Sequence, residues 1–268
     1  MVFFRNRVNK DLVIGLGEIG KPILKILSRS FPTTGFDINT KLMNTNEYNK
    51  MQDFKTIIAH ICIPYSKKFE DQVLKIISSH KPELIVIHST VSVGTTESIQ
   101  KKTKTPIIYS ATRGVHKRMI SDLKRYTKFF SVERTVPNAS WAKRIYTRRL
   151  HKAGIRTKNM SSPKTLELAK IICDTSYYGW LINYAQLSNM IAIEHKVNFD
   201  EMWSFSDEIH KYLGNRPKMH PGFIGGHCVI PNLDLIHDQT LGLIKQINQT
   251  YEKKINSTKK SIKKGIKK

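Results

Sequence analysis

Cys228 lies in a glycine-rich run that can present a thiol to a ligand. The run reads GFIGGHCVIP over residues 222–231, and a thiolate in such a loop is a strong nucleophile, especially where cations lower its pKa. The alternative interpretation is a small residue buried under a turn. His220 and His227 show no HxxxH spacing, so no metal site is predicted. Three cysteines at wide spacing form neither a disulfide framework nor a CxxC site, which leaves at least one free thiol. They are Cys62, Cys173 and Cys228.

A second set of residues has the spacing of a turn that binds phosphate. The sequence GLGEIG directly follows the apolar run DLVIG and opens a helical pattern, which is the context that a dinucleotide fingerprint needs. Gly17 would let the backbone approach a pyrophosphate, and Asp37, at the end of the next strand, would accept hydrogen bonds from ribose hydroxyls and repel a 2′-phosphate. We therefore expect NAD as the cofactor rather than NADP; the alternative is that the glycines serve only a turn. The turn residues are Gly15, Leu16, Gly17, Glu18, Ile19 and Gly20.

Short runs rich in Ile and Val alternate with amphipathic stretches over the first 135 residues, which predicts repeated β-α units. Cys62 falls in one of these apolar runs, and we expect it to fill the core. The expected strands cover residues 11–15, 33–38, 56–63, 84–90, 105–110 and 126–132. The expected helices cover residues 140–153, 163–195, 200–212 and 232–250.

The predicted fold class is α/β, a doubly wound parallel Rossmann sheet followed by an all-helical domain. The predicted domains are an NAD-binding domain over residues 1–160, a helical central domain over 161–245 and a Lys-rich tail over 246–268. No apolar stretch reaches the roughly 18 residues of a membrane span, and the N-terminus runs directly into a strand pattern. We expect an uncleaved, soluble, cytoplasmic protein.

The net charge of +24 favours an anionic partner. From residue 245 onward the chain has nine lysines and one glutamate, which is typical of a solvated, frayed appendage. Weak contact of this tail with a polyanion or a membrane surface is the alternative. The remaining positive charge suits an anionic substrate such as one with phosphates.

Four segments, in chain order, resemble motifs of the UDP-glucose/GDP-mannose dehydrogenase family. The segment ICIP, which ends at Pro64, is similar to the strand end that runs toward the nicotinamide. STVSVGTT over residues 89–96 is similar to the family's STVxxGTT loop. ELAK over residues 167–170 is similar to its ExxK motif, and GFIGGHCVIP over residues 222–231 is similar to the loop with the catalytic cysteine.

The resemblance implies a four-electron oxidation of a sugar nucleotide's primary alcohol with two NAD, through a thiohemiacetal and a thioester on Cys228. In this interpretation Lys170 stabilises an oxyanion, and Thr90 holds a water or a substrate hydroxyl beside the nicotinamide. Gly225 and Lys170 contact the substrate. The resemblance also implies polysaccharide biosynthesis and a homodimer through the helix that begins at Pro163. Pro64, Ser89 and Thr90 join the fingerprint residues as cofactor contacts.

The sequence departs from the family at residues that serve hydrolysis and oxyanion binding. Asp174 replaces the asparagine four residues after the helix lysine, and Asn232 replaces the aspartate four residues after the cysteine; we keep both in the catalytic set. Thr112 stands where the family often has a glutamate. The family's third domain, which contributes to the nucleotide-sugar site, has no counterpart in this sequence.

A cationic segment follows the fifth strand. Arg113 and His116 would clamp a phosphate or carboxylate of the substrate, and the alternative is a solvated basic loop. Two other functions stay open: a two-electron dehydrogenase that stops at the aldehyde, and a non-catalytic NAD-binding relative that acts as a partner or sensor.

Overall fold

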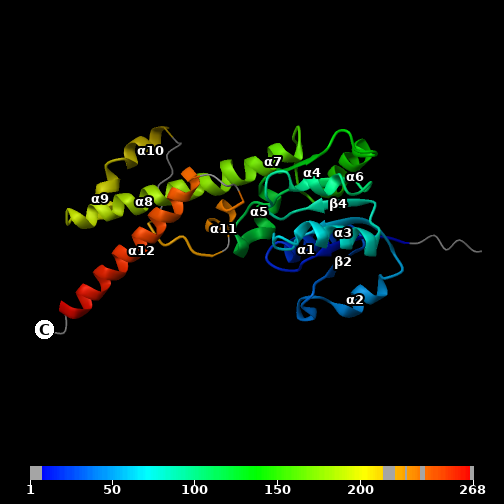
Figure 1. Ribbon diagram of the computed structural model, residues 1–268, viewed down its shortest axis with the longest axis horizontal. Coiled ribbons are helices and arrows are strands. Elements are labelled where there is room, and N and C mark those ends of the chain that lie inside the picture. The colour runs from blue at the N-terminus through cyan, green and yellow to red at the C-terminus, as the bar shows by residue number, and fades with distance from the viewer. Residues whose placement is uncertain (1–7, 214–220, 227, 236–238, 266–268) are drawn as a thin grey trace, which may run out of the picture. The chain divides into compact units, whose positions relative to one another are not determined.

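The computed structural model describes residues 8–213, 221–226, 228–235 and 239–265. The chain divides into two compact units, Met1–Lys170 and Ile171–Lys268, and each is described by itself (Figure 1). The first unit extends ten residues beyond the domain boundary that the sequence predicts. The reason is that α7 (Pro163–Ala169) packs onto the sheet, where Leu166 joins the core.

The first unit is built on a seven-stranded sheet in the order β2-β1-β3-β4-β5-β6-β7. Strands β1 to β5 are parallel, β6 runs antiparallel to β5, and β7 is parallel to β6. The predicted Rossmann-like class is thus confirmed, with an antiparallel step and a short edge strand added. The strands are β1 (Asn9–Ile14), β2 (Thr33–Phe36), β3 (Lys55–Ile61), β4 (Leu84–Ile87), β5 (Ile107–Tyr109), β6 (Lys128–Val132) and β7 (Thr157–Asn159).

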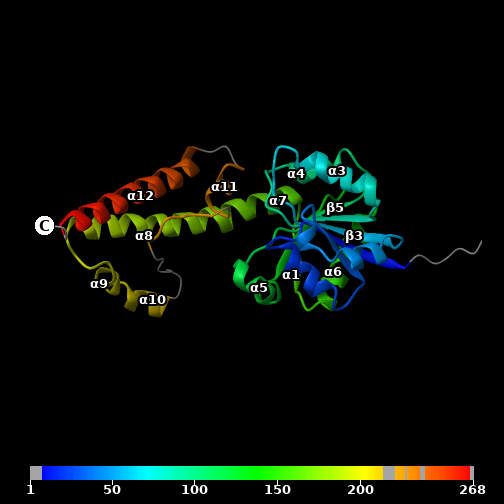
Figure 2. The same ribbon diagram turned by 90° about the horizontal axis from the view of Figure 1, so that it is seen from below.

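Helices cover both faces of this sheet, which explains why its central strand β4, LIVI, is apolar along its whole length. One face carries α1 (Gly20–Leu27), α5 (Met119–Arg125) and α6 (Ala139–Lys152). The other carries α3 (Phe69–His80), α4 (Thr95–Gln100) and α7 (Figure 2). Side chains of β1 alternate between the two cores, with Val13 in the first and Leu12 and Ile14 in the second.

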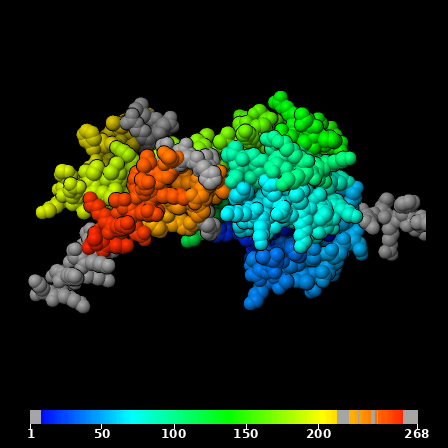
Figure 3. Space-filling view, viewed as in Figure 1, coloured from blue at the N-terminus to red at the C-terminus, as the bar shows by residue number. Residues whose placement is uncertain are grey.

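Short elements complete the first unit. The 3-10 turns η1 (Thr40–Leu42) and η2 (His116–Arg118) lie outside the sheet, and α2 (Thr45–Lys50) follows η1. In the space-filling view α2, in blue, forms the surface below α3, in cyan (Figure 3).

The second unit is helical, as expected. Its longest elements are α8 (Tyr177–Glu194) and α12 (Gln239–Gly265), which pack against each other. A Cβ atom on Gly179 would lie 3.2 Å from Cγ2 of Ile244, so this glycine permits the close approach of the two helices. The other helices are α9 (Phe199–Ser204), α10 (Asp207–Leu213) and α11 (Ile230–Leu233).

Several helical expectations need correction. The predicted helix over residues 200–212 consists of two helices, α9 and α10, and the one predicted over 232–250 is interrupted by a turn at Asp234 and Leu235 after α11. The predicted helix over residues 163–195 contains a π-helical segment, η3 (Lys170–Ser176), between α7 and α8. The predicted helix end near residue 250 is wrong, because α12 continues to Gly265 through most of the Lys-rich tail. None of the helices in the described part of the chain is long and apolar enough to cross a membrane.

Candidate active site

The three fingerprint glycines, Gly15, Gly17 and Gly20, differ in what a side chain at each position would contact. Gly15 has φ +88°, and a Cβ there would lie 2.8 Å from the carbonyl carbon and oxygen of Cys62. A Cβ on Gly20 would lie 1.7 Å from the carbonyl oxygen of Gly15. A Cβ on Gly17 would meet no described heavy atom within 4 Å. Gly15 and Gly20 are thus required by the fold, whereas Gly17 keeps space open beside the start of α1.

Asp37 is held next to this turn. Its Oδ2 accepts a 2.6 Å hydrogen bond from the backbone N–H of Leu16, and its Oδ1 accepts one of 2.8 Å from that of Asn39. The carboxylate is partly exposed at the end of β2, and a carboxylate oxygen can accept more than one hydrogen bond. Its fixed position beside the open space at Gly17 fits a dinucleotide whose ribose hydroxyls reach this carboxylate.

The ends of β3 and β4 lie beside the same edge of the sheet. Ser89 Oγ donates a 2.6 Å hydrogen bond to the carbonyl oxygen of Ile63, which ties the residues after β4 to those after β3. Thr90 is partly exposed and Pro64 is exposed at this edge. Cys62 packs against the core, and desolvation raises the pKa of its thiol to about 12, as expected for a core cysteine rather than a nucleophile.

Glu167 anchors the loop that carries Thr90. Its Oε2 accepts a 2.6 Å hydrogen bond from the Gly94 N–H, and its Oε1 accepts bonds from the Thr96 N–H, at 3.0 Å, and Thr96 Oγ1, at 2.6 Å. The side chain is fully buried, and desolvation raises the pKa of its carboxyl. The glutamate of ELAK and the loop STVSVGTT are therefore one structural unit, a connection that no local sequence signal reveals.

Lys128 on β6 holds the loop after β5. Its Nζ donates to the carbonyl oxygens of Ser110 and Ala111, at 3.0 and 3.3 Å, and to Thr112 Oγ1, at 3.0 Å. Burial lowers the pKa of the amine to about 7. Thr112 is 8% exposed. This threonine, at the position where the sequence resemblance implies a glutamate, thus accepts a hydrogen bond from the buried amine of Lys128. Lys128 has no signal in the sequence that predicts this role, because a single lysine in a mostly apolar strand forms no recognisable pattern.

Two buried histidines continue this polar cluster. His60 Nδ1 lies 2.9 Å from His88 Nε2, and His88 Nδ1 lies 3.2 Å from the carbonyl oxygen of Ser110. Because that carbonyl can only accept, His88 donates from Nδ1, and its Nε2 accepts from His60. Desolvation lowers the pKa of His60 to about 3 and that of His88 well below its usual value, so both rings are neutral.

Arg113 and His116 have different partners. Arg113 donates a 2.8 Å hydrogen bond from Nη2 to the carbonyl oxygen of Thr127 and lies 5.0 Å from the ring centroid of Phe129. His116 Nδ1 lies 2.7 Å from Oε2 of Glu18 in the fingerprint turn. His116 is therefore next to the expected dinucleotide site, and Arg113 is oriented by the β6 edge.

Lys170 and Asp174 both lie in the π-helical segment η3 and are partly exposed. A π-helical turn shifts the side chains that follow it relative to an α-helix, and such turns are frequent at functional sites. The sequence IICDTS carries no signature of this geometry.

Cys228 is exposed in the second unit, between Gly226, with φ +73°, and α11. Its carbonyl oxygen accepts a 2.6 Å hydrogen bond from Asn232 Nδ2, whereas the next residue, Val229, is buried with Ile244. The interpretation as a small core residue is therefore wrong, because the core position belongs to Val229. Gly225 is also exposed, and the positions of His220 and His227 lie outside the described residues.

Buried amides of α8 and α12 hold the segment that precedes Cys228, residues 222–226. Asn248 Oδ1 accepts a 2.8 Å hydrogen bond from the Ile224 N–H, and Asn248 Nδ2 donates one of 3.1 Å to the Ile224 carbonyl. Gln186 Nε2 donates to Asn248 Oδ1, at 2.9 Å, and to the carbonyl oxygen of Gly222, at 2.7 Å. Neither amide could be predicted as a contact of this segment, because both look like ordinary helix residues in the sequence.

Comparison with known proteins gives structural matches only. No protein-family model matches the chain, and no curated protein matches its sequence. Among solved structures, UDP-D-ManNAc dehydrogenase of Pyrococcus horikoshii matches 90% of this chain and 68% of its own, with 15% identity and a TM-score of 0.71. The UDP-N-acetyl-mannosamine dehydrogenase Cap5O of Staphylococcus aureus matches 96% of this chain and 71% of its own, with 16% identity and a TM-score of 0.72.

A dehydrogenase of another substrate class is also similar. The 3-hydroxyisobutyrate dehydrogenase of Mycobacterium tuberculosis matches 92% of this chain and 93% of its own, with 14% identity and a TM-score of 0.64. At these identities the likeness concerns the fold. The chain therefore has the fold of UDP-N-acetyl-mannosamine and 3-hydroxyisobutyrate dehydrogenases, a mostly parallel sheet with helices on both faces followed by a helical region.

Proposed function

We propose that the protein is an NAD-dependent oxidoreductase that acts on a CH–OH group. The observation that carries this proposal is the dinucleotide turn, in which Gly17 leaves open space and the Asp37 carboxylate is fixed beside it by the Leu16 N–H. The dehydrogenase names of the structural neighbours support the reaction class.

In this proposal the fingerprint residues hold the cofactor at the carboxyl ends of β1 to β4. Gly17 admits the pyrophosphate, Asp37 accepts the ribose hydroxyls and disfavours a 2′-phosphate, and the partly exposed Thr90 faces the nicotinamide end. NAD, when bound, supplies the acceptor for the hydride that leaves the alcohol carbon. Glu167 keeps the Thr90 loop in place through Gly94 and Thr96.

We propose that the substrate is a sugar nucleotide or a related anionic sugar, oxidised at a primary alcohol. The Cys228 thiolate adds to the aldehyde carbon, which forms a C–S bond and moves the carbonyl electron pair to oxygen; Lys170 stabilises that oxyanion. Asp174 and Asn232 complete the proposed catalytic set, Gly225 contacts the substrate, and His116 binds its anionic group together with Arg113. The exposure of Cys228 and its tie to Asn232 support this assignment.

A two-electron oxidation is the second candidate, because one structural neighbour is a 3-hydroxyisobutyrate dehydrogenase. The buried contact between Thr112 and Lys128 also favours it, since Thr112 offers no carboxylate for thioester hydrolysis. This reaction needs no thiol.

Further proposals concern the cellular setting. We propose a homodimer through α8, on which Tyr177, Tyr184, Leu187 and Ile191 are exposed, because large exposed apolar side chains mark interfaces. We place the protein in the cytoplasm, in keeping with its free cysteines, and its product in polysaccharide biosynthesis.

The test is NADH formation with a panel of UDP-sugars, GDP-sugars and 3-hydroxy acids, with NADH counted per substrate consumed. The proposal predicts two NADH per sugar nucleotide for the wild type and for Cys173→Ser, which changes another exposed thiol. It predicts no more than one for Cys228→Ser, because the thiol acts only after the first hydride has left. One NADH per substrate, unaffected by Cys228→Ser, would establish the two-electron reaction instead. NAD binding without turnover on any substrate would favour a non-catalytic relative.

A further inference from the structure

A long part of the first unit carries only positive charge. Residues 134–166 contain nine lysines and arginines and no aspartate or glutamate. The segment includes α6, whose sequence is ASWAKRIYTRRLHK. Because basic residues of globular surfaces are usually interspersed with acidic ones, this segment is a candidate binding surface for an anion.

The charges of α6 divide between its two sides. Ala142, Tyr146 and Leu150 face the core, and the inward Arg149 forms an ion pair with Asp11, with its Nε 3.0 Å from Asp11 Oδ2. The outward row consists of Arg144, Arg148 and Lys152, all exposed. Residues four apart along a helix are about 6 Å apart in rise, so this row spans about 12 Å.

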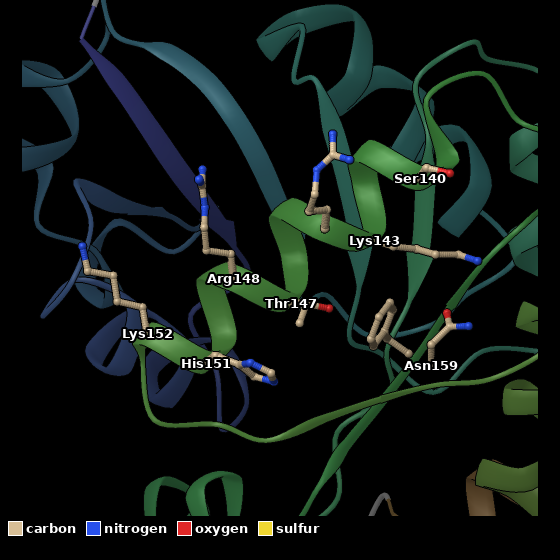
Figure 4. A pocket seen from close by; sticks show the side chains of 9 residues that line it. Ser140, Lys143, Thr147, Arg148, His151, Lys152 and Asn159 are labelled. Carbon is tan, nitrogen blue, oxygen red and sulfur yellow. The ribbon is translucent and has the colours of Figure 1, made fainter.

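A shallow, open groove of about 780 Å³ lies along this helix. In Figure 4, Arg148 and Lys152 extend from one side of α6, and Lys143, Thr147 and His151 extend from the other side, where Asn159 lies. Among the nine side chains that line the groove none is acidic, and four are Lys or Arg. The groove therefore combines a row of cations with hydroxyl and amide groups that can bind phosphate oxygens. The nine are Phe130, Ser140, Lys143, Arg144, Thr147, Arg148, His151, Lys152 and Asn159.

We propose that the α6 groove binds the sugar–phosphate backbone of a single-stranded nucleic acid without sequence preference. The three cations of the row lie about 6 Å apart along the helix axis, and a flexible single strand can bend so that its phosphates contact them in turn. Phe130 is the aromatic residue of the lining, and it is 3% exposed, so base stacking contributes nothing here. A membrane surface fits less well, because it needs exposed apolar side chains beside the cations, and none of the lining residues supplies one.

The experiment measures binding of a short fluorescent oligothymidylate to the full chain by anisotropy, as a function of salt. The test variant is Arg144→Glu/Arg148→Glu/Lys152→Glu. The control is Lys25→Glu/Lys50→Glu/Lys75→Glu, which makes the same change in net charge at exposed residues of α1, α2 and α3. Both variants keep the lysines of α12.

Loss of three phosphate contacts reduces the magnitude of the negative slope of log binding constant against log salt concentration by about 2. It also weakens the affinity at about 0.1 M salt by about 100-fold. We expect this loss in the α6 variant and a loss of only a few-fold in the control. The neutral variant Arg144→Gln/Arg148→Gln/Lys152→Gln should show the same smaller slope, and circular dichroism confirms that each variant is folded.

Equal losses in the two charge-reversal variants would overturn the proposal, because the overall field or the lysines of α12 would then account for binding. A fall in binding to phosphatidylserine vesicles, with oligonucleotide binding unchanged in the α6 variant, would also overturn it. NAD affinity is measured in parallel and is expected to be unchanged, so the result does not depend on the proposed oxidoreductase activity.

Discussion

Adding one methyl group to Gly17 or to Gly20 should separate the requirements of the cofactor from those of the fold. At Gly20 the new Cβ would lie 1.7 Å from the Gly15 carbonyl oxygen, and its other near neighbours are the Gly15 carbonyl carbon and Cys62 Cβ. The backbone of the turn must therefore move by more than 1 Å, since non-bonded carbon and oxygen atoms need about 3 Å or more. Overpacking of this kind costs about 1–3 kcal/mol, and we expect the upper end because the obstructing atom belongs to the backbone. After subtraction of up to about 1 kcal/mol that alanine gains over glycine in a helix, the free energy of unfolding should fall by about 2 kcal/mol.

Gly17→Ala should behave in the opposite way. Its Cβ would meet no described atom within 4 Å, and Gly17 is not among the glycines with positive φ. Alanine can therefore take the same backbone conformation, and the free energy of unfolding should stay constant or rise by up to about 1 kcal/mol. In the proposed site the same methyl group would occupy the space through which the pyrophosphate approaches, so NAD affinity should fall at least about 10-fold, or about 1.4 kcal/mol.

The assay combines urea unfolding, followed by circular dichroism, with calorimetric NAD titration of each variant. Gly20→Ala should lower the urea midpoint, and Gly17→Ala should keep the wild-type midpoint while losing NAD affinity. Gly17→Ala that binds NAD as tightly as the wild type would refute the assignment of this open space to the pyrophosphate. Gly20→Ala with an unchanged midpoint would refute the packing argument.

Three other substitutions test buried polar groups of the first unit. Glu167→Gln should lower the free energy of unfolding by about 2 kcal/mol, because an amide N–H₂ would face the Gly94 N–H and leave that donor unpaired. In the same urea titration Glu97→Gln, which changes a partly exposed carboxylate paired with Lys101, should have a much smaller effect, because solvent screens a surface ion pair. The pKa of Lys128 is about 7 in the folded protein, below its unfolded value. Between pH 7 and about 10 the unfolded state therefore binds more protons, and the free energy of unfolding of the wild type should rise with pH by up to about 1.4 kcal/mol per pH unit. Lys128→Met should remove that slope from unfolding curves measured at several pH values. The pKa of His60 is about 3 in the folded protein, so below about pH 6.5 only the unfolded state binds a proton at this imidazole. The free energy of unfolding should therefore fall as the pH drops below about 6.5. His60→Phe should reduce by one the number of protons taken up on acid unfolding, as measured by potentiometry.

The parts of the fold that the sequence predicts are those set by local pattern. β4 is LIVI, and β1 and β3 contain the apolar runs LVI and IIA. The turn at Gly15 has both its strand and its helix in register, so these elements needed no tertiary information. β7 could not be predicted, because its three residues, TKN, are polar and form a strand only by pairing with β6.

Other features depend on contacts between distant residues. α12 extends beyond its predicted end although the sequence there is mostly polar and basic. Tyr251 of α12 is buried, and Asn189 Nδ2 of α8 donates a 3.1 Å hydrogen bond to the Tyr251 hydroxyl. Packing on α8 therefore stabilises this part of α12. Lys128 and Glu167 each look like an ordinary surface residue in the sequence. Their roles come from acceptors or donors 16 to 18 and 71 to 73 residues away, which no local pattern encodes.

The measurement that tests the central claim most directly is the binding of NAD and NADP to the wild type and to Asp37→Asn by isothermal titration calorimetry. The wild type should bind NAD at least about 10-fold more tightly than NADP, because the Asp37 carboxylate accepts the ribose hydroxyls and repels the 2′-phosphate. Asp37→Asn should weaken NAD binding and narrow the preference, since the amide no longer repels a phosphate. A wild type that binds neither nucleotide, or that binds both equally and is unaffected by Asp37→Asn, would contradict the account.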